Sequence, residues 1–90
     1  MMYYIAVFKT KNHAMNIFYA LEEKRITPLE LISTPAKIVG GCSFSIKFDD
    51  LSKLQYFKQV NNKLSDALYG VYSVEKLNGK KHYEQLEIII

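Results

Sequence analysis

The sequence predicts an α+β fold in which two helices pack on one face of a sheet. Three observations support this class. Strand-like runs rich in β-branched and aromatic residues alternate with two stretches of helical periodicity. The chain has 90 residues, a length that suits one domain, and it shows no internal repeat or linker. Near its end the pair Asn78-Gly79 is a strong signal for a two-residue hairpin turn, and it predicts an added terminal strand.

The first half of the chain predicts a strand, a helix and a second strand. Tyr3–Phe8 has the composition of a buried strand. Thr10 or Asn12 is suited to cap a helix that runs to about Lys24. The apolar stripe of this helix follows the i, i+3, i+4, i+7 spacing and consists of Ala14, Ile17, Phe18 and Leu21. Leu29–Ser33 follows as a short second strand, which the next Thr-Pro pair ends.

The second half predicts a strand, a helix and a terminal hairpin. Cys42–Phe48 alternates apolar and polar residues as a half-buried strand does. One member of the Asp49-Asp50 pair then caps a second helix. The apolar side of that helix is expected to comprise Leu51, Leu54, Phe57, Val60 and Leu64. A fourth strand over 68–76 leads to the Asn-Gly turn, and a fifth strand over 82–90 pairs back on it.

In chain order these elements form a ferredoxin-like β-α-β-β-α-β sandwich with an added C-terminal hairpin strand. We expect a single domain over 1–90, with a core over 1–76 and a hairpin extension over 77–90. In this topology the third strand lies antiparallel beside the first. Cys42 should therefore face the turn over 9–13, and with it the N-terminus of the first helix.

The composition restricts the classes of function. Hydrophobic residues make up 49% and charged residues 23%, which argues against disorder. The net charge is only +3 and the lysines are scattered among nine carboxylates, so nucleic-acid binding is not favoured. No stretch approaches the ~20 apolar residues of a membrane span, and no basic segment of a secretory signal opens the chain. Together with a single cysteine, these features predict a cytoplasmic protein without membrane partners.

Cys42 is the only cysteine, and it follows Gly40 and Gly41. The glycines free the backbone to adopt positive φ, to approach another group closely and to present N–H groups to an anion. A helix N-terminus carries about half a positive charge and lowers the pKa of a nearby cysteine. One reading is therefore a reactive, stabilised thiolate. The other is an inert core residue, because Cys42 shares the strand parity of Phe44 and the following apolar residues.

The other polar candidates carry weaker signals. His13 near the first helix start could donate a hydrogen bond or a proton, although a solvated turn residue is the commoner case. His82 follows two lysines and is expected on the surface. Two His and one Cys lie too far apart in the chain for metal-ligand spacing, so no metal is expected. The Asp49-Asp50 pair is best explained as a helix cap.

Aromatic and apolar residues suggest interaction surfaces. Tyr3, Tyr4, Tyr69 and Tyr72 lie on strands expected to be neighbours, where exposed rings could stack RNA bases. The chain lacks the Lys/Arg-Gly-aromatic run that such modules carry. The terminal Leu86–Ile90 is apolar on both faces, which predicts that it covers the sheet or pairs with a second copy in a homodimer.

Over roughly residues 3–75 the chain resembles the selenium/sulfur carrier-like family of small bacterial proteins. The segments that carry the resemblance are Tyr3-Tyr4-Ile5-Ala6, His13-Ala14-Met15, Ile32-Ser33-Thr34-Pro35, Gly41-Cys42 and Gly70-Val71-Tyr72. The family commonly has Arg after the Thr-Pro pair and Gly after the Cys. This chain has Ala36 and then Lys37 at the first place and Ser43 at the second.

The resemblance implies a carrier, rather than a true enzyme, that holds a persulfide or selenopersulfide on Cys42. It implies a cysteine desulfurase-type donor, an acceptor of unknown identity and no cofactor. The residues that would stabilise the anion or shape its loop are His13, Thr34, Pro35, Lys37, Gly40 and Gly41. The alternative is a non-catalytic interaction or ligand-sensing module that uses the open sheet face and does not depend on Cys42.

Overall fold

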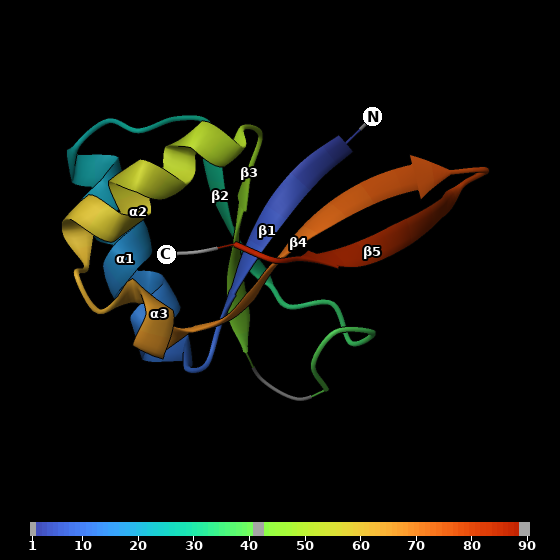
Figure 1. Cartoon of the computed structure of the whole chain (residues 1–90), viewed down its shortest axis with the longest axis horizontal. Coiled ribbons are helices and arrows are strands. Elements are labelled where there is room, and N and C mark those ends of the chain that lie inside the picture. Colours follow the sequence, from blue (N-terminus) through green and yellow to red (C-terminus); the bar gives the residue numbers. More distant parts are fainter. Residues whose placement is uncertain (1, 41–42, 89–90) are drawn as a thin grey trace.

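The computed structural model describes residues 2–40 and 43–88, in which a five-stranded sheet carries three α-helices on one face (Figure 1). In chain order the elements are β1 (Met2–Phe8), α1 (Lys11–Glu23), β2 (Leu29–Ser33), β3 (Phe44–Phe48), the 3₁₀-helix η1 (Leu51–Lys53), α2 (Leu54–Val60), α3 (Leu64–Ala67), β4 (Leu68–Leu77) and β5 (Lys80–Leu86). The strand order is β2-β3-β1-β4-β5 and all neighbours are antiparallel. This confirms the α+β class. With β5 at its edge, the sheet differs from the simple four-stranded ferredoxin-like order.

Helix α1 has the predicted cap and apolar stripe. The Thr10 side chain accepts a hydrogen bond from the backbone N–H of His13 at 3.1 Å, which satisfies one of the free donors of the first turn. The predicted stripe faces the sheet, and its buried members are Ala14, Ile17 and Leu21. At the other end Arg25 adopts a left-handed φ of 60°, and the N–H of Ile26 bonds the carbonyl of Leu21 at 3.1 Å. The helix therefore ends in a Schellman motif with arginine where glycine is usual.

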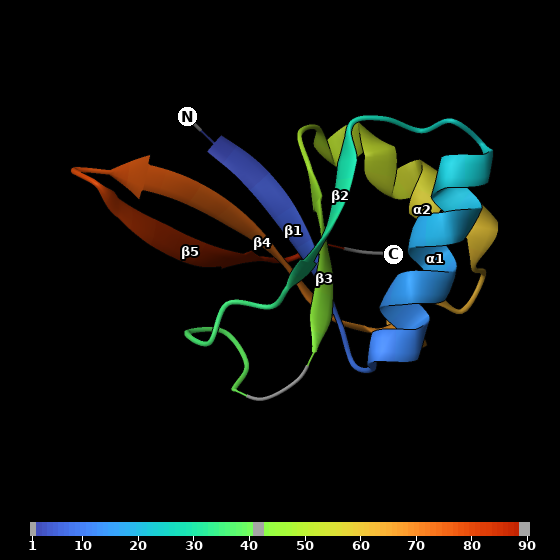
Figure 2. The same cartoon turned by 180° about the vertical axis from the view of Figure 1, so that it is seen from behind.

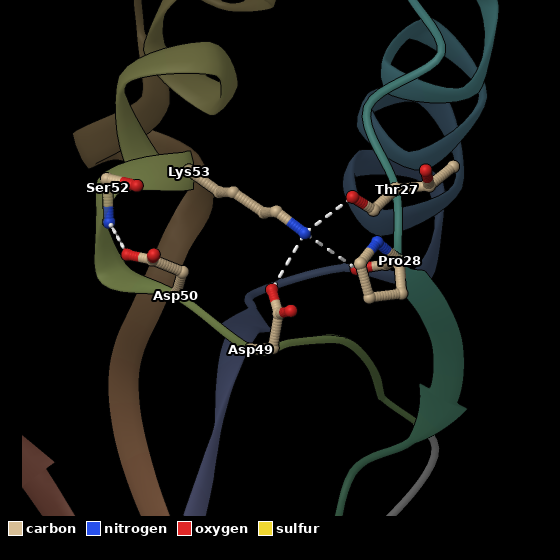
Figure 3. Close-up of polar contacts among 6 residues, drawn as sticks. All are labelled: Thr27, Pro28, Asp49, Asp50, Ser52 and Lys53. Carbon is tan, nitrogen blue, oxygen red and sulfur yellow. Dashed lines mark hydrogen bonds and ion pairs between the residues drawn. The ribbon is translucent and has the colours of Figure 1, made fainter.

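The second helical region is broken, which corrects the prediction of one continuous helix. Asp50 caps η1 as expected, because its Oδ1 accepts the N–H of Ser52 at 2.8 Å (Figure 3). Helix α2 then stops at Asn61, whose backbone is extended and whose Oδ1 accepts the N–H of Lys63 at 2.9 Å. An asparagine that bonds the backbone two residues on competes with the helix, so α3 starts as a separate turn. Leu51, placed by the prediction on the apolar side, is exposed.

The terminal hairpin forms at the predicted turn. Asn78 and Gly79 have φ values of 52° and 78°, which is the pattern of a type I′ turn. Strand β5 ends at Leu86, earlier than the predicted strand, and residues 89 and 90 lie outside the described part of the chain. Leu86 and Ile88 pack against the core on the helix side of the sheet. These two residues therefore cover core surface, and the homodimer stays a prediction.

The two faces of the sheet bury different residues. The face under the helices holds the main core, in which Ala6, Phe8, Ile46, Phe48 and Val71 pack with α1 and with Phe57 of α2. The opposite face, called here the helix-free face, centres on three buried residues, Ile5, Val7 and Val74. Partly buried side chains around them are Tyr3, Ile32, Ile38, Val39, Tyr72 and Tyr83. Functional residues on the two faces are therefore separated by the sheet.

Candidate functional site

The structure describes both sides of the candidate thiol, but Gly41 and Cys42 themselves lie outside the described residues. The predicted third strand also begins later than expected, at Phe44, and Ser43 precedes it outside the regular strand. The predicted antiparallel pairing of this strand with β1 is confirmed, with Ala6 opposite Ile46. The site is therefore built from the segments that lead to residue 41 and away from residue 42.

A buried polar stem joins these two segments. The N–H of Thr34 donates to the carbonyl of Ser43 at 2.9 Å, and the hydroxyls of Thr34 and Ser45 lie 2.7 Å apart. Thr34 is 7% exposed and Ser45 is fully buried at 0%. The stem extends the β2–β3 ladder by one pair beyond Ser33 and Phe44. The hydrogen bonds of Thr34 thus fix the end of β2, immediately before the loop that begins at Pro35.

Residues 35–40, called here the covering segment, turn back over the helix-free face. The carbonyl of Pro35 accepts the N–H groups of Ile38 at 3.0 Å and Val39 at 3.3 Å. This turn places Ile38 and Val39 against the cluster around Val7 (Figure 2). The sheet face that the sequence left open is thus partly covered by the chain itself.

Gly40 shows neither the positive φ nor the close approach that was expected of it. Its φ is outside the left-handed region, and a Cβ added to it would meet no described atom within 4 Å. Neither positive φ nor close approach therefore requires glycine at this position. The role predicted for Gly41 is untested, since it lies outside the described residues.

The start of β3 lies beside the first turn of α1. The Lys11 ammonium sits 5.0 Å from the centre of the Phe44 ring, which is a cation–π distance. His13 is exposed, and its Nδ1 lies 2.9 Å from the Thr10 hydroxyl. The sequence singled out His13 as the polar group of this turn. Lys11 was missed as a contact of the strand, although its position in the first turn could have suggested it.

Lys37 lies on the other side of the sheet from His13. It is exposed and borders a hollow with Tyr72, Lys81 and Tyr83 of the β4–β5 hairpin. His13 belongs to the helix layer that covers the opposite face (Figure 2). These two residues, which the resemblance implied would act together on the anion, therefore do not form one cluster.

Ser43 presents an unusual buried polar atom. The residue is 8% exposed, and its Oγ has no hydrogen-bond partner among the described residues. Buried hydroxyl groups normally form a hydrogen bond, so a buried hydroxyl without one is unusual. The sequence marked Ser43 only as a residue after the cysteine. The alternation that buries Ser45 could also have indicated Ser43.

A further hollow lies where β2 begins and β3 ends, at the opposite end of β3 from Cys42. It has a volume of about 360 Å³ and is lined in part by Tyr3, Glu30 and Lys47. The Lys47 ammonium lies 3.8 Å from Glu30 Oε2 and 4.4 Å from the centre of the Tyr3 ring. The charges of this hollow are therefore compensated by the protein.

Lys53 connects three segments of the chain near the start of β2 (Figure 3). Its Nζ donates to the carbonyls of Thr27 at 2.7 Å and Pro28 at 3.3 Å, and lies 2.7 Å from Asp49 Oδ1. The side chain is only 13% exposed. These contacts tie η1 to the start of β2, which is a structural role.

Residues 2–40 and 43–88 contain no group of three or more His, Cys, Asp and Glu side chains arranged to hold a metal ion. Among these residues, no helix has the length and apolar character needed to cross a bilayer.

Comparison with known proteins adds one positive finding. The model of a family described as "Putative Se/S carrier protein-like" matches residues 3–72. The matched span includes the stem, the covering segment and Cys42. No curated protein and no solved structure was found to match the chain.

Proposed function

Because the chain belongs to the putative Se/S carrier protein-like family, we propose that it carries a sulfur or selenium atom on Cys42. The observation that carries the proposal is that the family match covers residues 3–72, and that this span contains the single cysteine of the chain. A sole cysteine has no partner for an internal disulfide. Any sulfur or selenium atom that becomes bonded to the Cys42 sulfur must therefore come from another molecule.

The transfer is a displacement at sulfur. The Cys42 thiolate attacks the outer sulfur of a persulfide, R–S–SH, on a donor protein. A bond forms between Cys42 Sγ and that sulfur, the donor's S–S bond breaks, and the donor leaves as the thiolate R–S⁻. The product is Cys42–S–SH, with no net oxidation or reduction. A selenopersulfide, R–S–SeH, passes its selenium in the same way, and an acceptor protein receives the atom in the reverse step.

Two features of the described residues support this role. The stem of Thr34, Ser43 and Ser45 fixes the chain immediately after Cys42 through buried hydrogen bonds. The next residue, Phe44, lies under the Lys11 ammonium in the first turn of α1. A rigid support and a nearby cation are what an anionic carrier atom requires.

The strand order supports a ferredoxin-like arrangement for the part of the chain that the carrier uses. β1 lies between β3 and β4 and is antiparallel to both, and α1 connects β1 with β2 across β3. β5 then adds a strand beside β4. On this proposal the donor is a cysteine desulfurase-type protein, and both protein partners approach the end of the sheet where β3 begins.

The test is the pH dependence of Cys42 alkylation by iodoacetamide in the folded protein, followed by mass spectrometry. We expect rapid labelling with a midpoint clearly below the ~8.5 of a free thiol. A reference thiol is offered by Asn62→Cys in a Cys42→Ser background, because Asn62 is exposed in the turn between α2 and α3. That variant should label with an ordinary midpoint.

Persulfide transfer is then measured directly. Wild-type protein incubated with a persulfide-loaded donor protein should gain the mass of one sulfur atom, and reductant should remove it. The Cys42→Ser variant should gain none. Labelling of Cys42 only after denaturation, or no transfer to a thiol that labels readily, would refute the carrier function.

A further inference from the structure

The hollow between the covering segment and the terminal hairpin gathers cations and aromatic rings. It has a volume of about 340 Å³, within the range of small-molecule sites. The lining residues come from positions far apart in the chain and are Lys37, Ile38, Tyr72, Lys81, His82 and Tyr83. Figure 2 shows the covering segment and the hairpin on the same side of the molecule, away from the helices.

The hairpin sorts its charges between its two faces. Tyr83 packs in the cluster of the helix-free face, so Lys81, two residues before it, is on that face as well. Lys76 is the register partner of Lys81 and has the same orientation. Glu75 and Glu84 alternate with these residues and therefore lie on the opposite face. These two lysines of the hairpin thus lie on the helix-free face, Lys81 lines the hollow, and Glu75 and Glu84 lie on the other face.

These cations are also not neutralised by ion pairs. Within residues 2–40 and 43–88 the ion pairs are Lys47 with Glu30 and Lys53 with Asp49, and neither includes Lys37 or Lys81. The first of these pairs lines the hollow at the start of β2 and compensates its charge. Of the two hollows, the one beside Lys37 therefore has the stronger uncompensated positive charge.

The remaining lining favours a ligand with an unsaturated or apolar body. The rings of Tyr72 and Tyr83 and the side chain of Ile38 supply flat, apolar surface. Burial raises the pKa of Tyr72, and the nearby Tyr69 reinforces the shift. The Tyr72 hydroxyl thus stays protonated near neutral pH and can donate a hydrogen bond.

We infer that this hollow binds a small aromatic phosphate ester, with its phosphate on Lys37 and Lys81 and its ring against Tyr72 and Tyr83. Lysine ammonium groups form charge-assisted hydrogen bonds to phosphate oxygens, and the neighbouring rings bury the organic part. The site uses no atom of Cys42 and goes beyond the carrier function. It would remain if that function failed.

Phenyl phosphate is the probe, titrated into uniformly ¹⁵N-labelled full-length Cys42→Ser protein and followed by amide chemical shifts. We expect saturating shifts confined to residues 37–38, 72 and 81–83, with a dissociation constant on the order of 1 mM or lower. Phenol, which lacks the phosphate, should bind at least about tenfold more weakly, the effect expected for losing charge-assisted hydrogen bonds. Equal binding of phenol, or shifts spread over the surface, would overturn the inference.

Charge variants locate the phosphate. Lys37→Gln and Lys81→Gln should each weaken phenyl phosphate binding about tenfold while leaving the spectrum of the folded protein intact. Lys58→Gln removes the same charge from an exposed position on α2, across the sheet, and should leave binding unchanged. An equal loss in all three variants would indicate non-specific attraction to a basic protein and would refute the site. The site would also be refuted if phenyl phosphate did not bind and single-stranded oligonucleotides did, with an affinity that rises with their length. That result would assign the surface to nucleic acid.

Discussion

Replacing Thr34 with valine removes a hydroxyl from the buried stem while keeping nearly the same volume. In the wild type this hydroxyl lies 2.7 Å from the Ser45 hydroxyl, and Ser45 is 0% exposed. Water cannot easily replace the lost partner, because both residues are buried. Leaving a buried hydroxyl without a partner costs about 1–3 kcal/mol of unfolding free energy.

The size of the loss can be read from thermal or urea unfolding. For a domain of this length, about 2 kcal/mol corresponds to a melting temperature lower by roughly 8–16 °C. Thr27→Val is the matched control, because Thr27 is exposed and only its backbone carbonyl is used, by Lys53. An exposed substitution of this kind should change stability by less than about 0.5 kcal/mol.

A double-mutant cycle separates the hydrogen bond from the packing. Ser45→Ala should also destabilise the protein, because it leaves the Thr34 hydroxyl unpaired. The double variant should lose clearly less than the sum of the two single losses, since no buried hydroxyl is then stranded. Additive losses, or a neutral Thr34→Val, would show that the stem does not depend on this hydroxyl pair.

Three further substitutions test other parts of the structure. Lys53→Met should lower the unfolding free energy by about 0.5–1.5 kcal/mol in urea titrations, because it removes the hydrogen bonds of the ammonium to the carbonyls of Thr27 and Pro28, whereas Lys58→Met should have little effect. Hydrogen bonds from the backbone and side chain of Ser52 lower the pKa of Asp50, so its carboxylate stabilises the fold above the ordinary value of 3.8, and this stabilisation is lost as the pH falls through the lowered pKa. Asp50→Asn should therefore show a smaller drop in melting temperature between pH 6 and pH 3, and an unchanged drop would contradict the assignment. Arg25→Gly should raise the unfolding free energy by about 0.5–1 kcal/mol, because glycine adopts the left-handed φ of 60° without strain, and a loss of stability would count against the Schellman end.

Local signals predicted most of the secondary structure. The bounds of β2 follow from the apolar run between two Thr-Pro pairs, and the type I′ turn follows from Asn78-Gly79. The second helix was predicted as continuous because its apolar spacing continues past Asn61. The asparagine side chain bonds the backbone instead and ends α2, and periodicity does not detect this competition.

The site was less predictable, because its contacts join distant parts of the chain. The sequence identified Thr34, Pro35 and Lys37 as loop residues but gave no sign that Ile38 and Val39 cover the helix-free face. The resemblance grouped Lys37 with His13 as residues around the anion on Cys42, whereas the Lys37 side chain borders a hollow with Lys81 of β5. Pairing over such a separation depends on tertiary packing, which propensity and periodicity do not encode.

The stem also bears on how the loop can vary in length. The N–H of Thr34 is hydrogen-bonded to the carbonyl of Ser43 where the β2–β3 ladder ends, so the pairing of the two strands does not depend on the length of the loop between them. Lengthening a loop between fixed ends is entropically inexpensive, about 0.6 kcal/mol for each doubling. Gly40 is exposed, and a Cβ added to it would meet no described atom within 4 Å, which makes it a suitable point for inserted residues. A reporter peptide or an affinity handle could therefore be spliced in at this position without refolding the domain around it.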